Sequence, residues 1–465
     1  MSDEGLKRRD TIYALSTCYG KSGVAIIRIS GPESLKVLED VSFRLDILPR
    51  VATLGKIYDA STLDIIDEAI VIYFPKDNSY TGEDVVEFQV HGGIAIINKI
   101  LAMFNSFDYL RLAHNGEFTR IALENNRISL PKAESLIELI NSETEYQRKI
   151  AIKYYNGDLE DVYLNWRIQI VKLLSIAESY IDFPDDMLTI EELERLDYDI
   201  DSLDSKLQES IVFFDKADTL MSGVTVSIVG ETNVGKSTLM NILAKTDSSI
   251  VSDIAGTTRD VVQAKVELLG VPVVIQDTAG IRVTNDEIEK MGIEKSKRAM
   301  RSADIIVVIL DISNFRDLSI LSQVKDSQSK DANIIVLLNK IDRVDDCVEL
   351  EQLVVGHLKN MNFSYNELIP VSLKSKGSHL KVIKAIELLI TNFFPFSNAN
   401  LITNIRHQNS LESCSYYLQR VRKTKVLELK AEELRCAAKE IGGLLGDIST
   451  EEVLDEIFSS FCIGK

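Results

Sequence analysis

The sequence predicts a multidomain protein with an N-terminal α+β domain, an all-α helical domain, and an α/β domain inserted into the helical one. Three observations predict this. β-branched runs alternate with loops up to about residue 125, apolar residues recur at helical spacing on both sides of a central segment, and that segment alternates strands with helices. We therefore expect an N-terminal domain at 1–125, helical parts at 126–220 and 386–465, and the inserted domain at 221–385.

Composition limits the classes of function that the chain can have. Its 465 residues are enough for about three domains, and 45% are hydrophobic. With 52 basic and 71 acidic residues the net charge is -19, which opposes broad, sequence-independent binding to nucleic acid or to anionic membranes. No apolar run approaches the roughly twenty residues that cross a bilayer, and the first residues lack the apolar core of a signal peptide. We expect a cytoplasmic protein that does not enter a membrane.

The cysteines give no sign of a disulfide framework or a zinc site. There are five, an odd number, and none stands in C-x-x-C spacing. We expect most of them to be ordinary buried thiols.

The N-terminal region shows strand-like runs at 23–29, 68–74 and 85–90. The last of these continues into His91-Gly-Gly93 and a helical run at 94–101. Two interpretations remain open for the glycines: a helix N-terminus that receives an anion, or a plain tight turn. A single histidine beside such a turn is more often structural than catalytic.

The two flanking regions have helical patterns. From 126 to 220, apolar residues at spacings of three and four predict one long helix face, and the acidic residues beside it are most simply a solvated face. Asp182 to Asp186 contains a proline and is predicted to be an interhelical loop, and Leu411 to Leu445 returns to helical composition. The residues of the long face are Leu193, Leu196, Ile200, Leu203, Leu207, Ile211 and Phe214.

The inserted region contains a phosphate-binding loop. Gly230 to Thr238 reads GETNVGKST and matches G-x-x-x-x-G-K-[ST] between a β-branched run and a helical run, which is the context that the motif requires. Its glycines let backbone N–H groups surround a phosphate, Lys236 bridges the terminal phosphates, and Ser237 offers a hydroxyl to Mg²⁺. Further strands are expected at 224–229, 273–277, 305–310 and 334–338, which is a doubly wound α/β pattern.

Later motifs identify the base. Asp277-Thr-Ala-Gly280 supplies a carboxylate for the magnesium shell and a glycine amide for the γ-phosphate, and the threonines of Gly256-Thr-Thr-Arg-Asp260 serve the same site. In Asn339-Lys-Ile-Asp342, Asp342 can accept from guanine N1–H and the exocyclic amine, and Ser372-Leu-Lys374 is the usual site of a loop that contacts guanine O6. The motifs together predict a Ras-like α/β P-loop GTPase domain that binds GTP or GDP. The expected nucleotide-binding residues are Asn233, Val234, Gly235, Lys236, Ser237, Thr238, Thr257, Thr258, Asp277, Thr278, Ala279, Gly280, Asn339, Lys340, Asp342, Ser372, Leu373 and Lys374, with Mg²⁺ held by Ser237 and Thr258.

The hydrolytic residue differs from that of many regulatory GTPases. Ile281 stands where those proteins have a glutamine that orients the attacking water, and an isoleucine cannot do this. The acidic segment Asn285 to Glu289 is the nearest source of a substitute carboxylate. Asn233 within the phosphate loop carries a carbonyl that could coordinate a monovalent cation.

Taken with its other motifs, the whole chain resembles the MnmE (TrmE) family of tRNA-modification GTPases, from Asp10-Thr-Ile to the last residues. The resemblance implies a homodimer whose N-terminal domain binds 5-formyl- or methylene-tetrahydrofolate. It also implies a flavoprotein partner, MnmG (GidA), which carries FAD and with which the chain would form a heterotetramer or larger complex. This complex would bind tRNA and add an aminomethyl or carboxymethylaminomethyl group to C5 of the wobble uridine (U34). The matching motifs are Arg28-Ile-Ser-Gly31, Tyr80-Thr-Gly-Glu-Asp84, His91-Gly-Gly93, Gly116-Glu-Phe118, Asp182-Phe-Pro184, Gly256-Thr-Thr-Arg-Asp260 and Cys462-Ile-Gly-Lys465.

The same resemblance implies roles for single residues. Glu289 would be the catalytic residue that orients water, and K⁺ bound by Asn233, Ser252, Ile254 and Thr257 would support pairing of two GTPase domains. Folate contacts carry over to Arg28, Glu87, Arg127 and Lys465. Cys462 in the terminal motif is either a participating thiol or a packed residue, and packing is favoured because only Lys465 nearby in sequence would lower its pKa.

Three positions depart from the family pattern. Arg127 stands where lysine is common, which replaces a flexible cation with a planar fork. Cys18 stands where proline is usual, and Leu373 stands where the guanine loop usually has alanine.

Two other classes of function remain open. A ribosome-assembly GTPase would be a binding switch, and such proteins commonly add a basic RNA-binding domain, which this sequence does not show. Alternatively, the N-terminal domain would be a folate-dependent one-carbon enzyme for which GTP is only a regulator.

Overall fold

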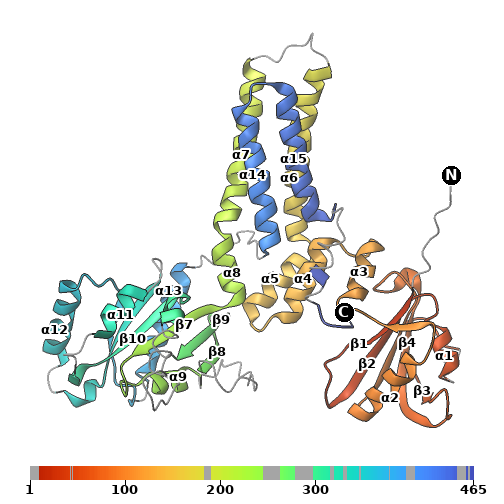
Figure 1. Cartoon of the computed structure of the whole chain (residues 1–465), viewed down its shortest axis with the longest axis horizontal. Coiled ribbons are helices and arrows are strands. Elements are labelled where there is room, and N and C mark those ends of the chain that lie inside the picture. The colour runs from red at the N-terminus through yellow and green to blue at the C-terminus, as the bar shows by residue number, and fades with distance from the viewer. Residues whose placement is uncertain are drawn as a thin grey trace. The chain divides into compact units, whose positions relative to one another are not determined.

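The computed structural model divides into two compact units, and Figure 1 shows their elements. The first unit contains Met1–Ile140, Ile152–Asp182 and Ala431–Lys465, and the second contains Asn141–Ala151 and Phe183–Lys430. The residues that the structure describes are 10–41, 43, 46–182, 190–244, 262–277, 297–314, 319–327, 332–344, 347–375, 377–393, 404–447, 457–458 and 461–464.

The first unit is built on a six-stranded sheet in the order β3-β4-β5-β2-β1-β6, in which only the β1–β6 pair is parallel. Helices α1 (Lys36–Asp40) and α2 (Ile94–Asn105) pack their apolar residues against one face of the sheet. The strands are β1 Thr11–Leu15, β2 Ser22–Ser30, β3 Thr53–Tyr58, β4 Ile65–Phe74, β5 Val85–Gly92 and β6 Leu110–Leu112.

The three predicted N-terminal strands are confirmed as β2, β4 and β5. The sequence did not predict β1, β3 and β6. β6 has only three residues, and β3 contains a glycine and a lysine that obscure its β-branched character.

Helices complete the first unit. Short α3 (Glu117–Glu124) follows β6, and α4 (Leu130–Asn141), α6 (Asp158–Asp182) and α15 (Leu427–Leu445) follow in the chain. A small apolar cluster of Ala133 with Phe458 and Phe461 fixes the C-terminal segment. Residues 461–464 then run antiparallel to the segment before α3, with a bridge between Asn115 and Ile463.

The helices of the second unit include α7 (Ile190–Val212), which packs on α14 (Ile405–Lys423). Among the described side chains of the predicted apolar face, Leu196, Ile200, Leu203 and Leu207 are buried. One part of that prediction was wrong. Phe214 is also buried, but it begins a separate helix, α8 (Phe214–Ser222), after a turn at residue 213. Another helix, α5 (Glu145–Tyr155), begins in the 141–151 segment of the second unit and ends in the 152–182 segment of the first.

The second sheet has the order β12-β11-β10-β7-β9-β8 and is parallel except for β8. α9 (Lys236–Leu243) and α13 (His379–Phe393) pack on one face, while α11 (Ser319–Ser327) and α12 (Cys347–Asn360) pack on the other. The strands are β7 Val224–Gly230, β8 Val262–Leu268, β9 Val271–Asp277, β10 Ile305–Asp311, β11 Asn333–Asn339 and β12 Glu367–Pro370.

The predicted fold class is confirmed: an α+β N-terminal domain, a helical domain, and an inserted P-loop α/β domain. The four strands predicted in the inserted domain correspond to β7, β9, β10 and β11. Among the described residues, no helix combines the length and apolarity needed to span a bilayer.

Candidate functional site

The carboxyl ends of four parallel strands meet at one edge of the second sheet. Gly230 ends β7, Asp277 ends β9, Asp311 ends β10 and Asn339 ends β11. In the register, Gly230 lies opposite Ile309, and Asp311 lies opposite Asn339. Open α/β sheets bind ligands at this edge, so the motifs predicted separately in the sequence converge on one site.

The phosphate loop joins β7 to α9 and leaves no space for side chains at its glycines. A Cβ on Gly230 would lie 2.6 Å from the carbonyl oxygen of Ile309. A Cβ on Gly235 would lie 2.5 Å from Asn339 Nδ2, and Gly235 has a φ of +116°. The motif therefore has glycine at these positions because neighbouring strands approach the loop closely.

Lys236 is buried and its ammonium is directed into the loop. Its Nζ donates to the carbonyl oxygens of Gly230, at 2.6 Å, and Glu231. Lys236 also begins α9, so the amides of the helix N-terminus and the ammonium surround the same space. Ser237 is the second residue of that helix. This set of donors fits an anion such as a terminal phosphate, with a hydroxyl beside it for a magnesium ion.

Asn339 ties three motifs together. Its Nδ2 donates to the carbonyl of Val234 at 2.6 Å, and its Oδ1 accepts from the backbone N–H of Leu373 at 3.0 Å. The buried side chain thus fixes the phosphate loop relative to the loop of Ser372 to Lys374. Leu373 takes part through its backbone amide. The contact is therefore the same whether this position holds leucine, as here, or the alanine that is usual in the family.

The residues expected to read the base are positioned by two further contacts. Lys340, with a φ of +68°, donates from Nζ to Asp311 Oδ2 at 2.5 Å. Ser372 Oγ donates to Asp342 Oδ1 at 2.5 Å, and this hydrogen bond lowers the pKa of Asp342 from its usual value. Asp342 is therefore held as an ionised acceptor, as guanine recognition requires. The Lys340–Asp311 pair was not predicted from the sequence, because Asp311 ends β10 while Lys340 follows β11, and the two residues belong to no shared motif.

Several predicted residues lie outside the described part of the chain, so the structure does not place them. They are Ser252, Ile254, Thr257, Thr258, Thr278, Ala279, Gly280, Glu289 and Lys465.

A second cluster lies on the first sheet, on the face opposite α2. Arg28 of β2 and Glu87 of β5 are register partners, and Arg28 Nε donates to Glu87 Oε1 at 2.8 Å. The guanidinium lies 5.9 Å from the ring centroid of Tyr80 and 5.7 Å from that of Phe118. Both residues of the pair are largely shielded, with side chains 19% and 15% exposed. An ion pair between aromatic rings suits a flat, polar heterocycle.

The C-terminal segment reaches this cluster. Arg28 Nη1 donates to the carbonyl oxygen of Gly464 at 3.4 Å, and Ser16 Oγ donates to the same oxygen at 3.0 Å. Gly464 has a φ of +96°, and a Cβ there would lie 2.3 Å from the carbonyl of Leu15. The terminal motif needs glycine here because the tail lies directly on β1.

The structure therefore brings together Arg28, Glu87 and the neighbour of Lys465. Arg127 lies beside Gly82 and donates from Nη2 to the carbonyl of Asp77 at 3.3 Å, at a separate point of the same domain. Cys462 is exposed, which disagrees with the expectation that it is a packed residue. The backbone of Cys462 makes the docking contact, with its carbonyl accepting from Gly116 N at 3.4 Å.

Sequence analysis did not identify Tyr80 and Phe118 as neighbours of Arg28. The available signal was that each aromatic residue stands in a glycine-containing motif, Tyr80 in the segment before β5 and Phe118 at the start of α3.

The His91-Gly-Gly93 motif is better explained as structural. His91 and Gly92 are the last residues of β5, and helix α2 starts only after Gly93. Asp67 accepts from the backbone N–H and from Nδ1 of His91, each at 2.8 Å, and so closes the sheet where β4 and β5 separate. Of the two interpretations left open for the glycines, the described contacts favour the structural one, and no described contact favours an anion site.

Comparisons with known proteins agree along the whole chain. The family model described as the GTP-binding protein TrmE N-terminus matches residues 11–127, and that of the MnmE helical domain matches 130–462, a range that encloses the second sheet. The tRNA modification GTPase MnmE of Wolbachia pipientis (from Culex pipiens) is 39% identical over 98% of this chain and 99% of its own length. The protein of the same name from Rickettsia typhi is 37% identical over 98% and 100%.

A solved structure of lower identity matches part of the molecule. Aquifex aeolicus Era bound to GDP.AlF4- aligns with a TM-score of 0.30 at 23% identity, over 44% of this chain and 69% of that chain. The assignment to a family therefore depends on the full-length relatives.

Proposed function

The chain belongs to the MnmE family of tRNA modification GTPases, and on that premise we propose that it hydrolyses GTP within a complex that modifies C5 of the wobble uridine (U34) of tRNA. The observation that carries the proposal is the presence in one chain of two sites: a phosphate loop with a base-reading carboxylate, and an ion pair between aromatic rings that the C-terminal tail reaches. The added group is aminomethyl or carboxymethylaminomethyl.

At the nucleotide site, the proposed binding residues have distinct roles. Lys236 bridges the terminal phosphates, and Ser237 with Thr258 would hold Mg²⁺, which would supply positive charge beside the γ-phosphate. Asp277 orients the magnesium shell, and Asp342 selects guanine. The buried position of Lys236 supports its assignment as a phosphate ligand. The described hydrogen bonds of its ammonium go to carbonyl groups, and a bound phosphate would add a negatively charged partner.

We further propose that the phosphate loop is activated by a second copy of the chain. K⁺ bound by Asn233, Ser252, Ile254 and Thr257 would supply the positive charge that an arginine finger gives in other GTPases, and Glu289 would orient water. Asn233 has a φ of +62°, a left-handed conformation that asparagine tolerates better than most residues, within the loop between Gly230 and α9.

Potassium dependence tests this activation. We expect GTP hydrolysis to be at least about tenfold faster in KCl than in NaCl at equal ionic strength, because Na⁺ is too small for the same ligands. Asn233→Ala should remove the difference between the cations while GTP affinity stays within about threefold. Equal rates for the unaltered protein in both salts would contradict the proposal.

The second cluster is proposed to bind 5-formyl- or methylene-tetrahydrofolate, which supplies the one-carbon unit. Glu87 can accept from ring N–H groups, and the guanidinium of Arg28 can donate to ring oxygen. The half-buried Tyr80 provides aromatic surface for a flat ring, while the fully buried Phe118 packs against the guanidinium. Lys465 follows Gly464, whose carbonyl already contacts Arg28, and Arg127 is proposed to contribute positive charge.

Arg28→Gln should lower the affinity for 5-formyltetrahydrofolate by at least about tenfold, because a charged, bidentate donor that also lies on two rings is lost. Isothermal titration calorimetry measures this. GTP hydrolysis should be unchanged, and Lys56→Gln, which removes an exposed cation from β3 of the same sheet, should leave both properties unaltered. Unchanged folate affinity in Arg28→Gln would refute the pocket.

The remaining parts of the proposal concern partners and place of action. We propose that the chain acts as a homodimer in the cytoplasm together with the FAD-carrying flavoprotein MnmG, in a heterotetramer or larger assembly. The net charge of -19 supports a division of labour in which the partner supplies most of the surface that binds tRNA.

A further inference from the structure

The short segment from Asn115 to Glu117 supports the C-terminal tail. Gly116 has a φ of +66°, and a Cβ there would lie 2.8 Å from the carbonyl oxygen of Phe458 and 3.0 Å from Cβ of Phe461. The backbone N–H of Gly116 donates to Cys462, and Asn115 forms a bridge with Ile463. The position of this segment therefore determines where the tail lies.

The next residues of the same turn contact Arg28 and its neighbour Tyr80. Phe118 presents its ring to the guanidinium, and Thr119 Oγ1 lies 2.9 Å from the hydroxyl of Tyr80, the second ring beside Arg28. Gly116 contacts the tail, and Phe118 contacts Arg28, which also holds the tail through Gly464. One turn of chain thus supports both parts of the site.

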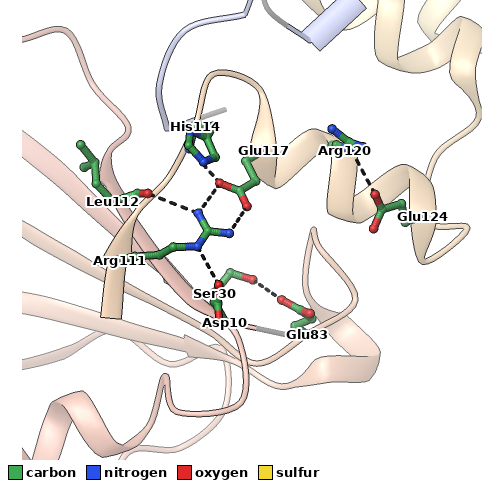
Figure 2. A network of polar contacts seen from close by, with 9 residues as sticks. All are labelled: Asp10, Ser30, Glu83, Arg111, Leu112, His114, Glu117, Arg120 and Glu124. Carbon is green, nitrogen blue, oxygen red and sulfur yellow. Dashed lines mark hydrogen bonds and ion pairs between the residues drawn. The ribbon is translucent and has the colours of Figure 1, made fainter. Parts of the chain in front are cut away.

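Glu117 fixes this turn, as Figure 2 shows. Its Oε2 accepts from the backbone N–H of His114 at 2.8 Å and from Arg111 Nη1 at 2.9 Å, while its Oε1 accepts from Arg111 Nη2 at 2.5 Å. Arg111 on β6 also donates from Nε to Asp10 Oδ2 at 2.9 Å. Although burial alone would raise the pKa of Glu117, the hydrogen bonds from Arg111 and His114 outweigh it and lower that pKa. The carboxylate stays charged, and the sheet edge is clamped to the start of α3.

We propose that Arg111 and Glu117 are a positioning pair for the one-carbon pocket, which they organise by fixing Gly116 under the tail and Phe118 beside Arg28. The inference rests on the proposed folate function, and it extends that function to two residues whose described hydrogen bonds go to neither Arg28 nor the tail. Because the contact is a bidentate fork, it fixes orientation as well as distance, which a single lysine ammonium cannot do.

The apolar core beneath the turn does not depend on the pair. Phe118 packs with Ile12, Ala14, Ala113 and Ile121 in a separate buried cluster. Removing the ion pair should therefore shift the turn without unfolding the domain, since an ion pair that is partly exposed contributes little to global stability.

The test compares Glu117→Gln and Arg111→Lys with Glu124→Gln, which breaks the Arg120–Glu124 pair of 3.1 Å on the same helix. Two quantities are measured: the affinity for 5-formyltetrahydrofolate, by calorimetry, and hydrogen exchange of the peptide 457–465 without ligand. In Glu117→Gln and Arg111→Lys we expect affinity to fall about tenfold and tail exchange to accelerate at least about threefold. GTP hydrolysis and circular dichroism should be unchanged, and Glu124→Gln should match the unaltered protein.

The outcomes separate the inference from the function on which it rests. If the unaltered protein does not bind the folate, the proposed function fails, while the exchange measurement still decides whether the pair holds the tail. Unchanged exchange and affinity in both variants would overturn the inference. Equal loss in Glu124→Gln would also overturn it, because the effect would then come from general weakening of α3. If Glu117→Gln does not fold, Arg111→Lys alone decides by the same two measurements.

Discussion

Asp342→Asn is expected to weaken GTP binding by at least about 100-fold and to create affinity for xanthosine triphosphate. Ser372 holds the carboxylate of Asp342 and lowers its pKa, so at neutral pH it only accepts hydrogen bonds. Guanine offers N1–H and an exocyclic amine to such an acceptor, whereas xanthine has an oxygen in place of the amine and needs a donor, which asparagine provides. Competition between the two nucleotides, followed by fluorescence of a labelled analogue, measures the exchange.

The gain of xanthine binding distinguishes a change of specificity from damage to the site. Asn339 fixes the neighbouring loops through Val234 and Leu373, and the substitution of Asp342 leaves these contacts in place. The variant should therefore bind xanthosine triphosphate about as tightly as the unaltered protein binds GTP. Retained preference for GTP would show that another residue reads the base.

The second large effect is expected in Glu289→Ala, which should lower the rate of GTP hydrolysis by at least about 100-fold while nucleotide affinity changes less than about threefold. Ile281 cannot orient a water molecule, so the carboxylate of Glu289 is proposed to do so instead. A residue that acts only on the attacking water contributes to the transition state and not to nucleotide binding. Single-turnover hydrolysis and equilibrium binding measure the two effects separately.

Glu287→Ala is the matched control, because it removes a carboxylate two positions away in the same acidic segment. Its rate should stay within about threefold of the unaltered protein. A large loss of nucleotide affinity in Glu289→Ala would assign the residue a structural role, and equal loss of hydrolysis in both variants would mean that the charge of the segment matters and not one side chain.

The described part of the candidate nucleotide site could be predicted from the sequence because its chemistry is local. A phosphate loop must have glycines where Ile309 and Asn339 approach it, and these requirements leave fixed spacings in the sequence. The Lys340–Asp311 contact could not be predicted, since it joins residues that only the order of strands in the sheet brings together.

The second site was less predictable. The resemblance to a family supplied Arg28 and Glu87, and the register of β2 with β5 explains why they meet. Sequence patterns gave no reason to place the last residues of the chain on β1, because the contact between Ser16 and Gly464 spans almost the entire chain. The aromatic rings of Tyr80 and Phe118 converge on Arg28 only after that fold has formed.

The pair of sites also bears on the rival functions. A ribosome-assembly switch would not need the proposed folate site, and a folate enzyme that only senses GTP would not need the proposed catalytic role of Glu289. The tRNA-modifying account uses both sites.

The most direct test of that account is mass spectrometry of wobble nucleosides in tRNA from cells that lack this chain. We expect the C5-modified wobble uridines to disappear, to return when the unaltered chain is supplied, and to stay absent when Asp342→Asn or Arg28→Gln is supplied instead. Wobble uridines that keep their full modification without the chain would contradict the account and favour a role in ribosome assembly.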